Sequence, residues 1–257
     1  MLILNIIDER SGVKSRLLKA VRFTRVERHI FPEGRVIIIN QYADMGRIGW
    51  RTVERMVHKH RVKMVMSRGA EPPYGCSVEK YDSSEFRQKV LIDTFIKIIR
   101  RARPKAVGIY GEIPFTAAAQ LLSVTGQLRI CTEAPEKYRE LTERAVSEYG
   151  TAPVISDSLS VLSGTAAVLA MEGRDIKRIQ PGTPVFSNDY GYSVGDASFI
   201  LPAEIEEILP ESISKADFLA AAVERGMTAQ CPIECRYLCK NGGRSAVNSL
   251  CKLVAGR

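Results

Sequence analysis

Short, continuously apolar segments alternate with amphipathic segments along most of this chain, and that alternation limits the folds open to it. Segments such as Val36–Ile39 are typical of parallel strands that are buried on both faces. The pattern predicts an α/β protein with a mostly parallel sheet flanked by helices. The predicted strands are Leu2–Ile7, Arg35–Asn40, Val62–Ser67, Ala106–Tyr110, Leu128–Cys131, Pro153–Ile155, Pro184–Phe186 and Ser198–Leu201.

Four helices are predicted from start and stop signals such as a leading Ser, Asp or Pro and a closing Gly or Pro. They run from Asp82 to the residues before Pro104, from Pro135 to Gly150, from Asp157 as N-cap to Met171, and from Ser214 to Gly226. Residues 11–34 fit either a helix or, over Ala20–Val26, an edge strand.

The composition is that of an ordinary globular protein, with 45% hydrophobic residues in 257. No apolar run approaches the roughly 18 residues that a membrane span needs. The apolar start is interrupted by Asp8–Arg10, which does not fit a signal peptide. We therefore expect a cytoplasmic protein without a targeting segment or membrane contact.

The net charge of +8 is unevenly distributed along the chain. Residues 1–105 carry 23 Lys and Arg against 11 Asp and Glu, a net charge of +12, and residues 106–257 carry −4. With Pro104 as the boundary, this predicts a basic α/β region over 1–103 and a second region over 104–257 with Cys-rich C-terminal helices. The basic half either binds nucleic acid or an acidic partner or presents a solvated basic face.

A strand, a tight turn and a helix of small residues follow the predicted boundary. Strand Ala106–Tyr110 leads into Gly111–Pro114, and such a turn aims backbone amides and a helix N-terminus at a ligand above the sheet. Gly111 permits a close backbone approach. Glu133 follows the next strand, 22 residues after Gly111, where a carboxylate can accept hydrogen bonds from a ribose diol.

This stretch resembles the NAD(P)-binding Rossmann superfamily, most closely the nicotinamide-binding halves of shikimate dehydrogenases and glutamyl-tRNA reductases. The resemblance implies a Rossmann-like C-terminal half and an NAD(P) cofactor. The sequence departs from the superfamily pattern because Ile109 and Pro114 replace the outer glycines, Pro114 lacks an N–H group, and Glu112 would repel a pyrophosphate. These departures favour an adenosine-type ligand such as S-adenosylmethionine. The predicted cofactor-binding residues are Gly111, Glu112, Ile113, Pro114, Thr116, Thr132, Glu133, Asp157 and Ser158.

Two loops are candidates for contacts with a substrate. Asp189 and Tyr190 follow strand Pro184–Phe186 and are predicted to act as acid or base, unless the loop is a plain turn. Arg68 and Tyr74 follow strand Val62–Ser67 and are predicted to bind substrate, with Arg68 suited to a carboxylate or phosphate. The alternative for this second loop is a long connection without a role.

Four of the six cysteines lie near the C-terminus and are candidate ligands for zinc or an iron–sulfur cluster. The spacing of Cys235 and Cys239 predicts one shared helix face, with Asn241–Gly243 ending that helix. The alternative is that the cysteines are small buried hydrophobic residues. The four candidates are Cys231, Cys235, Cys239 and Cys251.

The preferred function is that of a small-molecule enzyme, an NAD(P)-dependent oxidoreductase. A close alternative is an S-adenosylmethionine-dependent methyltransferase in cofactor or metabolite biosynthesis. A third is a non-catalytic module that binds nucleic acid or a protein partner. We expect a homo-oligomer, most simply a homodimer. The sequence contains no Walker loop and no recognisable catalytic triad, which argues against ATPases, kinases and hydrolases.

Overall fold

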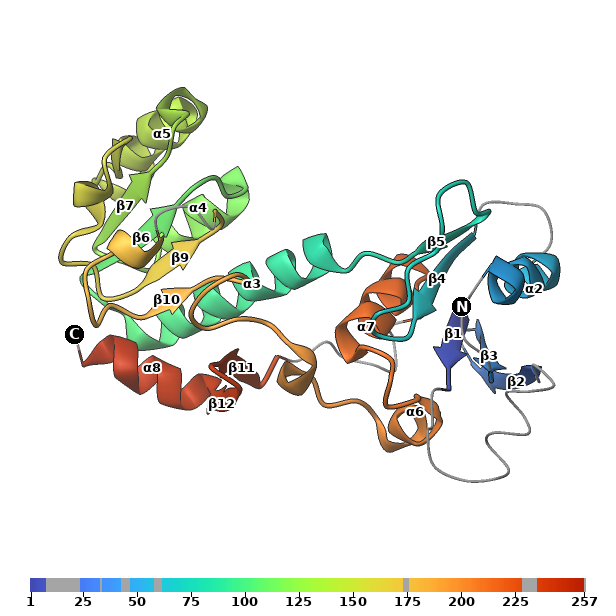
Figure 1. Ribbon diagram of the computed structural model, residues 1–257. Helices are drawn as coiled ribbons and strands as arrows, with labels where there is room; N and C mark the ends of the chain where they lie inside the picture. The colour runs from blue at the N-terminus through green and yellow to red at the C-terminus, as the bar shows by residue number, and fades with distance from the viewer. Residues whose placement is uncertain are drawn as a thin grey trace. The chain divides into compact units, whose positions relative to one another are not determined.

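The computed structural model describes residues 1–7, 24–32, 34–42, 47–57, 62–172, 176–227 and 235–256. The chain divides into two compact units, coloured by residue number in Figure 1. Unit 1 comprises Met1–Ser84 and Leu201–Ile233, and unit 2 comprises Glu85–Ile200 and Glu234–Arg257. The first boundary lies after Ser84, before Pro104 in the sequence. Leu201–Ile233, from the C-terminal half of the chain, belongs to unit 1.

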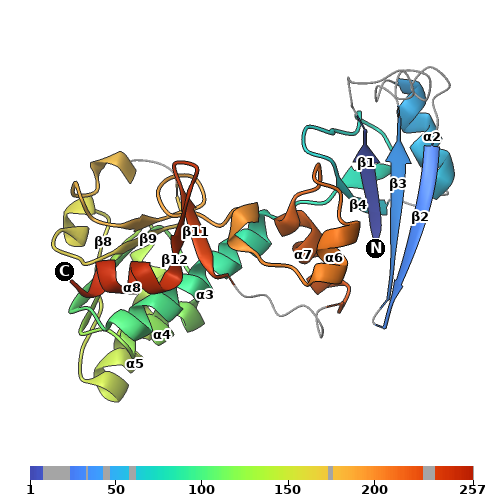
Figure 2. The ribbon, with the colours of Figure 1, turned by 90° about the horizontal axis from the view of Figure 1, so that it is seen from below.

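Unit 1 is built on a five-stranded sheet with the order β2–β3–β1–β4–β5. Four strands are parallel, and β2 pairs antiparallel with β3 at one edge, as Figure 2 shows. The ambiguous segment before residue 34 therefore contains an edge strand, and its part before Thr24 lies outside the described residues. The strands are β1 (Leu2–Ile6), β2 (Thr24–Phe31), β3 (Gly34–Gln41), β4 (Val62–Met66) and β5 (Val78–Lys80).

Helices cover the sheet of unit 1 because its central strands are apolar on both faces. Helix α2 (Arg47–Val57) places Trp50 against Leu4 and Met64 in one buried cluster. Ile3 precedes Leu4 in β1 and so faces the opposite side of the sheet. It is also fully buried, as expected for a strand covered on both sides. Residues 201–227 supply α6 (Ala203–Ile208) and α7 (Lys215–Glu224), and α7 contacts β4.

Unit 2 contains a second five-stranded sheet, with the order β10–β9–β6–β7–β8 and parallel pairing throughout. The chain builds outward from β6 through β7 to β8 and then crosses to the other side of β6 for β9 and β10. Such a switch point leaves a crevice at the carboxyl ends of the strands. The strands are β6 (Ala106–Tyr110), β7 (Gln127–Cys131), β8 (Val154–Ser156), β9 (Val168–Ala170) and β10 (Val185–Phe186).

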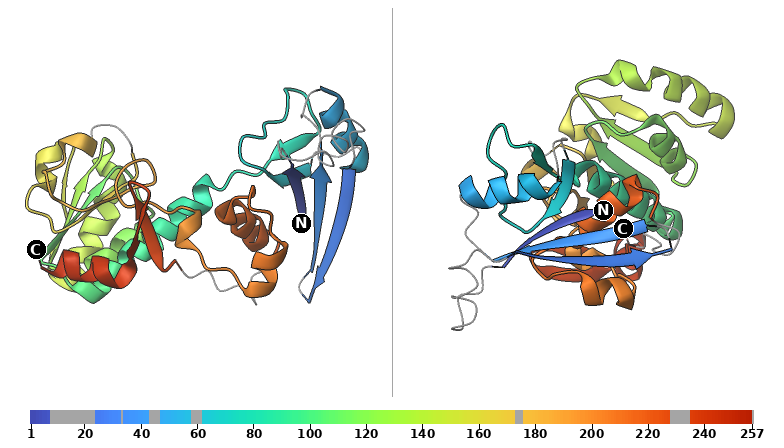
Figure 3. Two further views of the ribbon diagram at one scale, coloured as in Figure 1. Left: turned by 60° about the horizontal axis from the view of Figure 1, so that its bottom comes forward. Right: turned by 90° about the vertical axis from the view of Figure 1, so that its right-hand side faces the viewer.

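The helices of unit 2 pack around this sheet (Figure 3). Helix α3 buries Phe95 against Phe186 of β10 in an edge-to-face pair with ring centroids 5.1 Å apart. The predicted helix from Pro135 is present and ends at Gly150, which has a φ of 67°. The α-helices are α3 (Ser84–Ala102), α4 (Phe115–Leu122), α5 (Arg139–Tyr149) and α8 (Val247–Ala255), and the 3-10 helices are η1 (Pro135–Tyr138), η2 (Leu159–Leu162), η3 (Ile176–Arg178) and η4 (Asp196–Ser198).

The predicted helix from Asp157 to Met171 is wrong. Only the single turn η2 forms, and its cap is Ser158, whose hydroxyl accepts the amide of Ser160 at 3.3 Å. Gly164 then turns the chain with a φ of 74°, and the following small residues form β9. A central strand buried on both faces and a buried helix have the same all-apolar composition, which explains the error.

Two predictions near the C-terminus are also wrong. Ser198–Leu201 is not a strand, because η4 ends at Ser198 and only Phe199 forms an isolated bridge, to Cys235. Cys235 and Cys239 do not share a helix. The chain there forms the hairpin of β11 (Tyr237–Lys240) and β12 (Gly243–Ala246), because Asn241 and Gly242 adopt positive φ values suited to a tight turn.

Among the described ranges, no helix combines the length and the apolar character that crossing a membrane requires.

Candidate functional site

The carboxyl ends of four adjacent strands of unit 2 surround a cavity of about 490 Å³, called here the strand-end cavity. It lies at the switch point of the sheet, where ligands bind in open α/β sheets. The parallel register places the last residues of β6, β7 and β8 side by side. The cavity is lined by Tyr110, Cys131, Thr132, Glu133, Asp157, Leu159, Glu172 and Arg178.

Three predicted cofactor residues meet in this cavity: Thr132, Glu133 and Asp157. Thr132 is buried, and its hydroxyl accepts the amide of Ala134 at 3.1 Å, which holds the turn that carries Glu133. Glu133 and Asp157 are exposed at the rim. Carboxylates from two neighbouring strand ends thus face one volume.

Glu172 is a further lining residue, and sequence reasoning missed it. It lies two residues after the end of β9, a segment that the sequence analysis assigned to the last part of a helix, so that no strand end was predicted there. A Cβ atom added to Gly111 would lie 2.9 Å from Oε1 of Glu172. Gly111 is therefore required for the close approach of this carboxylate to the turn after β6.

The electrostatic character of the strand-end cavity is negative. Burial raises the pKa of the Cys131 thiol, and the charges of Asp157 and Glu172 raise it further. Three carboxylates line the cavity against one guanidinium, that of Arg178. Such a site suits a ligand with hydroxyl donors or a positive charge better than a polyanion.

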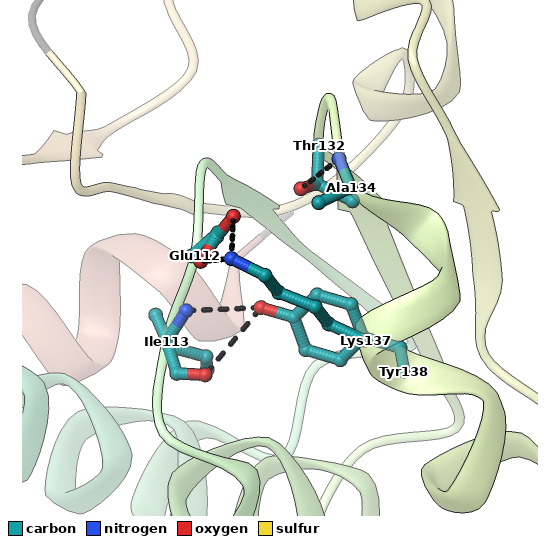
Figure 4. A network of polar contacts seen from close by, with 6 residues as sticks. All are labelled: Glu112, Ile113, Thr132, Ala134, Lys137 and Tyr138. Atoms are coloured by element: carbon teal, nitrogen blue, oxygen red, sulfur yellow. Dashed lines mark hydrogen bonds and ion pairs between the residues drawn. The ribbon is translucent and has the colours of Figure 1, made fainter.

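The turn after β6 is held by hydrogen bonds within the protein. The Gly111 amide donates to the carbonyl of Cys131 at 2.8 Å. The Ile113 amide donates to the hydroxyl of Tyr138 at 2.9 Å, and Glu112 pairs with Nζ of Lys137 at 2.6 Å (Figure 4). Two of the backbone amides predicted to face a ligand, those of Gly111 and Ile113, thus already have acceptors within the protein.

The remaining predicted residues lie elsewhere. Pro114 and Thr116 line a different cavity, of about 360 Å³ between α3 and α4, together with Ile92 and Ile96. Ser158 lies next to Asp157 and caps η2.

Asp189 and Tyr190 lie in the turn after β10. This turn folds back on the strand: the Ser187 amide donates to the carbonyl of Tyr192 at 3.0 Å, and the Tyr192 amide donates to the carbonyl of Val185 at 2.8 Å. Tyr190 is exposed, and the lining of the strand-end cavity includes neither predicted acid–base residue.

Arg68 and Tyr74 belong to unit 1, in the connection after β4. The amide of Arg68 donates to the carbonyl of Ser212 at 2.9 Å, and the side chain of Tyr74 is fully exposed. Their role in binding substrate stays a prediction.

Two of the C-terminal cysteines, Cys235 and Cys239, lie near each other, and both approach the hydroxyl of Ser198. Cys235 is buried, Cys239 lies in β11 and Cys251 lies in α8, whereas Cys231 is outside the described residues. Burial raises the pKa of the Cys235 thiol. Within the part of the chain that the structure describes, no three His, Cys, Asp or Glu side chains gather as a metal site. The zinc or iron–sulfur site stays a prediction.

Tyr138 is expected to stabilise the turn after β6. Burial raises the pKa of this phenol, which contacts both the amide and the carbonyl of Ile113. Tyr138→Phe should lower the free energy of unfolding by about 1–2 kcal/mol, because it leaves a buried amide without its acceptor. Urea denaturation measures this loss.

Tyr190→Phe is the control, since removing the hydroxyl of an exposed phenol should change the free energy of unfolding by less than about 0.5 kcal/mol. Equal losses in the two variants would contradict the assignment.

No protein-family model, curated protein or solved structure matches this chain.

Proposed function

We propose that the strand-end cavity binds the adenosine part of a cofactor and that the protein is a small-molecule enzyme, with S-adenosylmethionine as the favoured cofactor. The observation that carries the proposal is the convergence of Glu133, Asp157 and Glu172 on one cavity. Glu133 follows the second strand of unit 2, where Rossmann-like proteins bind a ribose diol. If β6 is numbered as the first strand of unit 2, the strands lie in the order 3-2-1-4-5. This order also occurs in Rossmann-like nucleotide-binding sheets, which supports a nucleoside ligand at the strand ends.

The side chains have distinct roles in this proposal. Glu133 accepts hydrogen bonds from the ribose hydroxyls, and Thr132 keeps the backbone before it in place. Tyr110 and Leu159 offer apolar surface to the base, and Glu172 and Asp157 complement a positive charge. S-adenosylmethionine, when bound, supplies a methyl group activated by its sulfonium.

The donor set fits a dinucleotide less well. A pyrophosphate requires backbone amides at the turn after the first strand of the unit, and those of Gly111 and Ile113 donate within the protein. The carboxylate of Glu112 at this turn is paired with Lys137, and Pro114 has no amide to donate. An NAD(P)-dependent oxidoreductase is therefore the second candidate, and the reaction class follows from the cofactor that binds.

The test is calorimetric titration of the full chain with S-adenosylmethionine, S-adenosylhomocysteine, NADH and NADPH. The adenosyl ligands should bind at one site. Glu133→Gln should weaken that binding about tenfold or more, because the amide has one accepting oxygen instead of two and no charge to strengthen the hydrogen bonds from the ribose hydroxyls. Glu136→Gln is the matched control, since Glu136 is an exposed carboxylate three residues away that does not line the cavity.

Three outcomes would overturn parts of the proposal. Binding of NADH or NADPH without the adenosyl ligands would favour the oxidoreductase. Equal weakening by the two Glu variants would remove Glu133 from the site. No binding of any of the four ligands would leave the non-catalytic module as the function.

A further inference from the structure

Strand β2 forms one edge of the sheet in unit 1 (Figure 2). It pairs with β3 over all eight of its residues, contains no proline and is not interrupted by a bulge. Among the residues that the structure describes, no other strand lies along its outer edge. Edge strands of this length are usually shielded in proteins, because their free N–H and C=O groups pair readily with another strand.

The backbone groups of every second residue of β2 point toward this outer edge. The Ile37 amide of β3 donates to the carbonyl of Met1 at 2.9 Å, on the side of β1. Ile37 therefore points away from β2, and in an antiparallel pair the residue opposite it, Arg28, points away from β3. The N–H and C=O groups of Val26, Arg28 and Ile30 are thus directed outward, where they are available to a further strand.

The side chains of β2 also favour a partner strand. Val26 and Ile30 lie on one face of the sheet and are 44% and 77% exposed. Apolar β-branched side chains on neighbouring strands stabilise a sheet when they lie directly opposite each other. The two residues are placed symmetrically about Arg28, which matches them to a second copy of the same strand running in the opposite direction.

We propose that β2 pairs antiparallel with β2 of a second copy of this chain, with the twofold axis at Arg28, so that the two five-stranded sheets join into one. This register places Val26 opposite Ile30 of the partner subunit, and it does so twice because of the symmetry. On the other face, Glu27 lies opposite His29 of the partner subunit, an acidic residue opposite a basic one. Arg28 lies opposite Arg28 of the partner subunit, which is unfavourable and limits the affinity. This dimer is independent of the cofactor proposed above.

The test is sedimentation velocity of the full chain over concentrations from about 1 to 100 µM. A strand edge is a small interface, so that a dimer that dissociates on dilution is expected. Val26→Lys and Ile30→Lys should each weaken dimerisation about tenfold or more, because each places two charges against apolar side chains in the symmetric interface. Val146→Lys is the matched control, since Val146 of α5 is 58% exposed and lies outside β2. It should leave the dissociation constant within about twofold of the parent protein.

Three further variants test the register. Adding Ile30→Glu to Val26→Lys should restore dimerisation to within about threefold of the parent protein, because each introduced lysine then faces an introduced glutamate of the other subunit. Adding Val146→Glu to Val26→Lys changes the net charge equally and should not restore it. Arg28→Thr should tighten the dimer about tenfold, because it removes the like charges at the axis.

The altered side chains are all exposed, and circular dichroism checks that the variants fold. The proposal is overturned if the protein stays monomeric over the whole concentration range, or if it dimerises and neither Val26→Lys nor Ile30→Lys weakens the dimer. It is overturned equally if Ile30→Glu and Val146→Glu have the same effect when added to Val26→Lys, or if Arg28→Thr weakens the dimer.

Discussion

Phe95→Ala should lower the free energy of unfolding by about 3–5 kcal/mol, the largest effect expected for any single substitution proposed for this protein. Phe95 and Phe186 are both fully buried, and their rings meet edge to face at 5.1 Å. Removing one ring leaves a cavity between α3 and β10 and also removes the aromatic pair. Urea denaturation followed by circular dichroism measures the loss.

Phe86→Ala is the matched control, because Phe86 lies on the same helix but is only half-buried. Its ring stacks on Phe199 with centroids 5.9 Å apart, so that some loss is expected, but a clearly smaller one. If Phe86→Ala costs as much as Phe95→Ala, the contact between α3 and β10 is not the centre of the core of unit 2.

Gly191→Ala should destabilise the protein by about 3 kcal/mol. Gly191 has a φ of 96°, and a Cβ atom there would lie 2.3 Å from the carbonyl oxygen of Val185. Backbone strain costs about 1–3 kcal/mol. Displacing Val185 also breaks its hydrogen bond from the Tyr192 amide, 2.8 Å long, which adds about 1 kcal/mol. Urea denaturation gives the total, and hydrogen exchange at Tyr192 shows whether the turn with Asp189 and Tyr190 opens.

Gly150→Ala separates backbone strain from the steric clash. Gly150 also has a positive φ, of 67°, but a Cβ atom there would meet nothing within 4 Å. Its cost should be about 1 kcal/mol, from the left-handed conformation alone. If Gly191→Ala lowers the free energy of unfolding no more than Gly150→Ala does, the turn after β10 accommodates the added Cβ without cost. That result would contradict a tight contact between Gly191 and the carbonyl of Val185.

The candidate site was partly predictable because part of it follows local sequence. Glu133 and Asp157 follow β7 and β8 within two residues, and the carboxyl ends of parallel strands lie at one edge of a sheet. Glu172 escaped prediction because β9 is composed of the same small apolar residues as a buried helix. The engagement of the Ile113 amide by Tyr138 was equally hidden, since the two residues are 25 positions apart.

By itself the sequence determined that the chain forms an α/β protein and where most strands lie. It also determined where α3, α7 and the helical segment made of η1 and α5 begin and end, because the hydrophobic period and capping residues act locally. Only the tertiary structure decided which distant segments meet. The acidic segment 201–233 returns to the basic N-terminal unit, so that the two units carry similar net charges, +3 for unit 1 and +5 for unit 2. The charge difference between the halves of the sequence is thus not a difference between folded units. The order of the strands in each sheet and the placement of residues 201–233 in unit 1 depend on contacts between residues far apart in sequence. No local pattern encodes those contacts.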